Sequence, residues 1–214
     1  MKIIKLIILV VAINTVNIAS ADIFSFFKKS SSSESTTTTA NTIGSIINSI
    51  VSTDKVEVKD VVGEWKYSSP SISFKSDNIL EQAGGNAAVT TIENKLAPYF
   101  KKVGFESFVI NIKSDSTFEI TIRNKTITGT IANGTEKGTL LFNFSAFGKV
   151  GSKSYTFYVT KGVSEMSLML DVTKFSEFLA NISSYAGSSS SIAQVASLLK
   201  RYKGVYAGMS LTKK

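Results

Sequence analysis

The sequence offers few side chains that do chemistry near neutral pH. Among its 214 residues there is no His and no Cys. Their absence excludes Ser-His-Asp and Cys-His catalysis and removes the usual ligands of zinc. Only carboxylates, hydroxyls, lysines and tyrosines remain. We therefore expect a protein that is not an enzyme and that holds neither a metal nor a cofactor.

Three carboxylates, Asp77, Glu81 and Glu93, lie in or near a helical stretch. Helix capping and solvated helix faces explain them, and nothing places two of them together in a cleft, as paired-carboxylate catalysis requires. The pair Gly84-Gly85 lacks the following Lys-Ser/Thr of a phosphate-binding loop.

The formal charge of +8 is spread thinly along the chain. The two basic clusters, at residues 101–102 and 200–203, fall near the ends of predicted helices, where cations favour the negative end of the helix dipole. No basic stripe alternates with aromatic residues, so we expect no nucleic-acid partner.

The first residues are typical of a secretory signal peptide. Lys2 and Lys5 precede an apolar stretch over residues 3–18, and Ala19-Ser20-Ala21 forms a small-residue cleavage site. We predict a signal peptide at 1–21, whose removal subtracts two lysines and lowers the charge from +8 to +6. The alternative is an uncleaved membrane anchor, but polar residues at 14, 15 and 17 interrupt a run already short for a membrane span. We expect an exported protein, periplasmic or secreted, with no transmembrane segment after cleavage.

Residues 22–57 are expected to form a linker followed by a short helix. Residues 28–41 are rich in Ser and Thr and too poor in apolar side chains to pack. Apolar residues at 43, 46, 47, 50 and 51 then follow the spacing of one helix face. Such a helix would cover an edge or an open end of the following domain.

The folded domain is predicted over residues 58–214. A first strand runs to Tyr67, and Pro70 predicts a bend after it. A helical insertion at 77–102 follows, with Asp77 as N-cap of its first helix and a second helix from about Asn86 to Lys102, where Pro98 kinks or ends the last turns.

Strands dominate the rest of the domain. Six runs alternate apolar and polar residues, at 108–112, 117–122, 126–131, 140–144, 155–159 and 166–170. Short Gly- and Asn-containing turns join them, so neighbours pair antiparallel. A second helical insertion at 173–202 precedes a final strand at 205–211 that pairs back toward the first.

This order predicts a mainly β fold: an up-and-down antiparallel β-barrel of about eight strands with helical insertions. In a soluble barrel the apolar face points inward. An outer-membrane barrel would invert the pattern and use strands of about ten residues, longer than those found here.

The motif Gly63-x-Trp65 at the head of such a barrel resembles the signature of the lipocalin and calycin group. The stretches Val62-Gly63-Glu64-Trp65, Phe74-x-Ser76-Asp77-Asn78-Ile79-Leu80, Ala83-Gly84-Gly85 and Ile92-Glu93-x-Lys95-Leu96-x-Pro98-Tyr99 are similar to a family of exported, lipocalin-like bacterial proteins of unknown function. The resemblance covers about residues 58–214 and implies a Gram-negative, gut-associated source. It implies a barrel able to hold a small ligand.

Two functions remain open. The first is binding of a small hydrophobic or amphipathic ligand inside the barrel of a monomer; the second is a structural or protein-interaction domain with a filled core, whose protein partner the sequence does not identify. Trp65 is interpreted first as a plug at the closed end of the barrel. The residues predicted to line the interior and contact a ligand are Trp65, Phe108, Phe118, Phe142, Phe144, Phe157, Met166 and Leu168.

Overall fold

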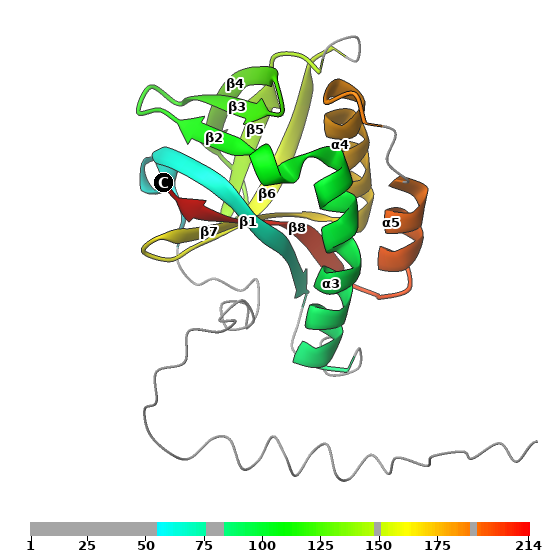
Figure 1. Cartoon of the computed structure of the whole chain (residues 1–214). Coiled ribbons are helices and arrows are strands. Elements are labelled where there is room, and N and C mark those ends of the chain that lie inside the picture. The colour runs from blue at the N-terminus through cyan, green and yellow to red at the C-terminus, as the bar shows by residue number, and fades with distance from the viewer. Residues whose placement is uncertain (1–54, 76–83, 148–150, 189–191) are drawn as a thin grey trace, which may run out of the picture. The chain divides into compact units, whose positions relative to one another are not determined.

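Eight strands close into one antiparallel barrel in the computed structural model, which describes residues 55–75, 84–147, 151–188 and 192–214 (Figure 1). Each strand pairs with its neighbours in sequence, and β8 returns to β1, as predicted. The predicted signal peptide, the linker, the helix at 41–51 and the helix begun by Asp77 lie outside the described residues. The strands are β1 (Gly63–Phe74), β2 (Val109–Ile112), β3 (Thr117–Ile122), β4 (Lys125–Asn133), β5 (Thr139–Phe144), β6 (Lys153–Lys161), β7 (Glu165–Asp171) and β8 (Val205–Lys213).

The alternation of side chains along the strands separates an apolar interior from a polar exterior. In β3, Phe118, Ile120 and Ile122 are buried, while Glu119 between them is exposed. Because side chains in a strand alternate between the two faces, this pattern directs the apolar set inward. The predicted orientation of the apolar face is therefore confirmed.

The prediction of a bend after Tyr67 is wrong, because β1 continues through Pro70 to Phe74. A bulge between Tyr67 and Ser69 shifts its register against β8. The extra residue reverses the alternation: Trp65 is buried before the bulge, and Ile72 and Phe74 are buried after it. The bulge thus keeps apolar side chains on the inner face without ending the strand.

Strand β1 pairs over a long stretch with one neighbour and over a short stretch with the other. β1 pairs with β8 along nearly its whole length, from Trp65 to Phe74, but with β2 only from Gly63 to Lys66. The N–H of Tyr67 makes one further bond, to the carbonyl of Phe108. Beyond this point β1 and β2 separate, and a helix lies beside β1 instead.

Gly208 makes a close approach of strands possible at the other edge of β1. Ser71 and Met169 both pair with Gly208, one from each side, and the Ser71 hydroxyl donates to the Met169 sulfur at 3.7 Å across it. A Cβ at position 208 would overlap the carbonyl oxygen of Leu168. Only glycine at position 208 lets β7 and β8 approach each other this closely.

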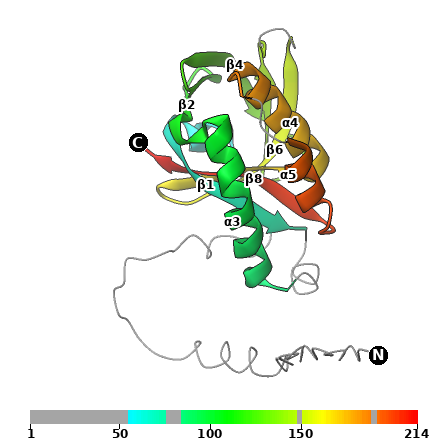
Figure 2. The same cartoon turned by 45° about the vertical axis from the view of Figure 1, so that its right-hand side comes forward.

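The α-helices of the described residues lie on one side of the barrel in both views (Figures 1 and 2). They are α3 (Asn86–Val103), α4 (Val172–Tyr185) and α5 (Ile192–Leu199), and short 3-10 turns η1 (Val58–Val61) and η2 (Phe105–Ser107) flank the first strands. The predicted position of α3 is confirmed, and α4 and α5 occupy the second predicted insertion, although α5 ends three residues before residue 202. Pro98 lies inside α3, which continues to Val103 and ends at Gly104 in the left-handed conformation. None of the helices in the described ranges is both long and apolar enough to cross a bilayer.

Trp65 is held at the end of the barrel next to η1. Its indole N–H donates to the carbonyl of Val61 at 2.8 Å, and the side chain is fully buried. The ammonium of Lys213 lies 5.8 Å from the ring centre. A buried indole with a satisfied N–H is a structural anchor, which agrees with the predicted plug.

Candidate functional site

The eight predicted interior residues are all buried, none more than 3 % exposed. Neighbouring rings contact each other: the Phe118–Phe142 and Phe142–Phe157 centroids are 5.3 and 5.2 Å apart. Phe144 packs on Phe118 at 5.0 Å. The strands therefore bring the five phenylalanines, with Met166 and Leu168 of β7, into one core with Trp65.

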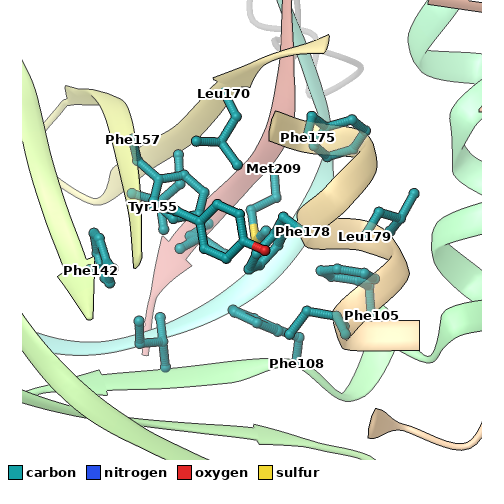
Figure 3. Close-up of a cluster of buried hydrophobic side chains, with 14 of the residues drawn as sticks. Phe105, Phe108, Phe142, Tyr155, Phe157, Leu170, Phe175, Phe178, Leu179 and Met209 are labelled. Atoms are coloured by element: carbon teal, nitrogen blue, oxygen red, sulfur yellow. The ribbon is translucent and has the colours of Figure 1, made fainter. Parts of the chain in front are cut away.

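Helix α4 inserts aromatic side chains into this core (Figure 3). Phe178 lies edge-on to Phe157 and to Tyr155, with both centroids at 5.4 Å. Burial raises the pKa of Tyr155 to about 12, and its hydroxyl accepts a hydrogen bond from Asn181 at 2.6 Å. The rings from the strands and the helix point toward one another. Ligand contact by the eight residues stays a prediction, and it requires this packing to open.

A groove lies outside this core, where β1 has separated from β2 and α3 runs beside it. It has a volume of about 920 Å³. Its apolar wall includes Tyr67, Pro70 and Pro98, and the remaining lining residues are Ser68, Ser69, Thr90, Glu93, Asn94, Ala97, Lys101 and Glu106.

The floor of the groove is a strand edge with few free donors. The N–H of Lys75 faces β8 and bonds to Gly204, whereas the N–H of Ile72 faces the opposite edge. Backbone groups alternate between the two edges of a strand, so Pro70 presents its nitrogen to the same edge as Ile72. Proline has no N–H, and the N–H of Ile72 is already bonded. Both features oppose the addition of another strand here.

Glu93 supplies the bond to this edge. Its carboxylate oxygen accepts from the N–H of Ile72 at 3.1 Å. The side chain is half-buried, and burial raises its pKa from 4.5 to about 7 although the backbone hydrogen bond works in the opposite direction. A carboxylate with a pKa near neutrality exchanges its proton under ordinary conditions.

Two other polar groups belong to residues that line the groove with Glu93. Burial, with the charges of Glu106 and Glu93, raises the pKa of the Tyr67 phenol. The hydroxyl of Ser69 is buried and has no hydrogen-bond partner within the described residues. The groove therefore combines an apolar wall with a few polar groups, which is the composition of small-molecule sites.

Sequence reasoning missed Glu93, which it assigned to helix capping or a solvated face. A signal was present in the spacing. Glu93 stands four residues after Val89, three before Leu96 and seven before Phe100, and these positions share one face of a helix. That face packs against β1, so the carboxylate is drawn partly out of water.

A second, smaller hollow of about 470 Å³ lies between α3 and α5. Its lining mixes apolar residues with the basic Lys95 and Arg201, and the Tyr99 hydroxyl donates to Gln194 at 3.1 Å. Across the described ranges, acidic side chains nowhere gather in the threes that a metal ion needs.

Comparison with known proteins places the chain in a family. No curated protein matches the sequence. Among solved structures, a similar chain is that of a DUF4847 family protein from Bacteroides vulgatus, with 15% identity, a TM-score of 0.35, and coverage of 72% of this chain and 94% of that one. A family profile described as a lipocalin-like domain (DUF4923) matches residues 35–213, and the chain therefore belongs to this lipocalin-like family.

Proposed function

We propose that the protein is an exported, monomeric, non-catalytic binder of a small amphipathic molecule, and that the groove between β1 and α3 is its binding site. The observation that carries this proposal is the form of the groove. Its volume of about 920 Å³ falls within the ~300–1,000 Å³ typical of ligand sites. Its apolar wall and few polar groups match the same class.

The barrel interior is the weaker location for the ligand. Rings from β3, β5, β6 and α4 already contact one another at centroid distances near 5 Å. A ligand placed among them would have to displace side chains from a close-packed core, which costs free energy. The groove needs no such displacement.

Export is proposed from the N-terminal sequence, in which a basic start, an apolar run and Ala19-Ser20-Ala21 follow one another. Sequencing the N-terminus of the protein from its host tests it. A chain that starts at Asp22 supports export with cleavage. A chain that retains Met1 and remains in the cytoplasmic fraction contradicts export.

Native mass spectrometry tests the binding proposal. The protein is purified without denaturation from the organism that makes it, and we expect an added mass that organic extraction removes. Ala97→Trp places a large ring in the groove and should abolish the added mass. Ala87→Trp is the matched control, because Ala87 is exposed on the same helix but does not line the groove.

Two outcomes contradict the proposal. An added mass that survives in the Ala97→Trp protein would place the ligand elsewhere, with the barrel interior as the next site to examine. A clean apo mass that does not shift after incubation with a lipid extract of the host would remove the binding function. The filled-core interaction domain would then be the better interpretation.

A further inference from the structure

The charge of Glu93 has no cationic partner in the groove. The charged and titratable groups that face it are Tyr67 from β1, Lys101 from α3 and Glu106 from η2. The ammonium of Lys101 is paired with Glu106 at 3.3 Å. None of the ion pairs found among the described residues includes Glu93.

The structural bond that Glu93 makes does not require a charge. An amide oxygen would accept the N–H of Ile72 equally well, and a Gln at this position would avoid the cost of placing a charge partly out of water. The local packing and the bond to Ile72 therefore do not require a negative charge at position 93. An opposite charge brought by a ligand would compensate it.

The rest of the groove fits a ligand with a single charged end. Tyr67, Pro70 and Pro98 supply an apolar wall next to Glu93. One carboxylate is too few oxygen ligands for a divalent metal ion. A compact N–H donor satisfies the carboxylate by a charge-assisted hydrogen bond.

We propose that the ligand is an organic monocation, with a protonated amine or guanidinium that pairs with Glu93 and an apolar body that lies along Tyr67 and Pro98. This inference rests on the proposed binding function and specifies the chemistry of its ligand. Because a bound cation favours the ionised carboxylate, binding releases a proton from Glu93 near neutral pH. Affinity then rises with pH through neutrality.

Calorimetric titration with three matched probes tests the inference. Octylamine, octanol and octanoate share one alkyl chain and differ in the charge of the head group. At about pH 8 the amine is protonated and Glu93 is ionised. We expect octylamine to bind about tenfold more tightly than octanol, and octanoate to bind more weakly than both.

Glu93→Gln should remove the preference for octylamine over octanol, because the substitution removes the charge but keeps the apolar wall and the bond to Ile72. Glu119→Gln is the matched control, since Glu119 is exposed on β3 and does not line the groove. It should leave all three affinities as they are. A circular dichroism spectrum identical to that of the parent protein confirms that each variant is folded.

The outcomes separate the two proposals. Equal affinities for octylamine and octanol, both lost in Ala97→Trp, would overturn the cationic ligand and keep the groove as the binding site. A preference for octylamine that persists in Glu93→Gln would overturn the role of Glu93. Absence of binding by all three probes, together with a clean apo mass, would overturn the binding function itself.

Discussion

Glu93 should make the stability of the protein depend on pH in a direction unusual for a carboxylate. Its pKa is raised from 4.5 to about 7 in the folded state. Between these values the folded protein holds a proton that the unfolded chain lacks. The free energy of unfolding therefore falls as pH rises from about 4.5 to about 7, and then levels off.

The size of the effect follows from the same shift. A rise from 4.5 to about 7 corresponds to about 3 kcal/mol for a fully buried group. Glu93 is partly exposed, so solvent screening reduces this to about 1–2 kcal/mol. Glu93→Gln should thus raise the free energy of unfolding by about 1–2 kcal/mol at pH 8 and change it little near pH 4.

Urea unfolding of the parent, Glu93→Gln and Glu119→Gln proteins between pH 4 and pH 8 measures this difference. The chain is suited to the experiment because it contains no His and no Cys, whose titration would otherwise dominate this range. Any contribution from the α-amino group is common to all three proteins. A Glu93→Gln protein with the pH profile of the parent, or one less stable than the parent at pH 8, would refute the reasoning.

Three further substitutions test the fold by urea unfolding. Gly208→Ala should cost more than about 3 kcal/mol or prevent folding, because the new Cβ overlaps the Leu168 carbonyl oxygen; a stable variant would contradict the close approach of β7 and β8. Trp65→Phe should cost about 2–4 kcal/mol, because it leaves the buried Val61 carbonyl without its donor and opens a space; a loss below 1 kcal/mol would contradict the anchoring role. Phe178→Ala should cost about 3–5 kcal/mol and let the fluorescent probe N-phenyl-1-naphthylamine enter the barrel; unchanged fluorescence would show that the core closes over the space.

The barrel was predictable because each strand carries its own signal. Alternation fixes which side chains face inward, and short turns force neighbours to pair antiparallel, so strand order follows from chain order. Pro70 alone did not show whether β1 ends in a bend or continues through a bulge. The change of alternation between Trp65 and Ile72 fits either a bend or a bulge, and pairing with β8 decides for the bulge.

The candidate site was harder to predict, because it depends on where two segments separate. The interior residues were chosen correctly as core, since burial follows from alternation. The groove depends instead on β1 leaving β2 after Lys66 and on α3 lying beside the freed edge. Neither event has a local sequence pattern. Only the helical spacing of Glu93 with Leu96 and Phe100 indicated that this carboxylate is not fully solvated.

Helix α3 also helps to protect the unpaired edge of β1, because it carries Glu93. A strand edge left unpaired exposes backbone donors and acceptors that invite association with other chains. Here Pro70 removes one donor and Glu93 occupies another, so the edge is protected without a pairing strand. A Gln would protect it equally well and give a more stable protein above neutral pH. Stability is commonly lost where a site is shaped for function. The proposed cationic ligand would account for the charged group at position 93. If the proposal holds, the gain in stability of Glu93→Gln and its loss of octylamine preference appear together in one variant.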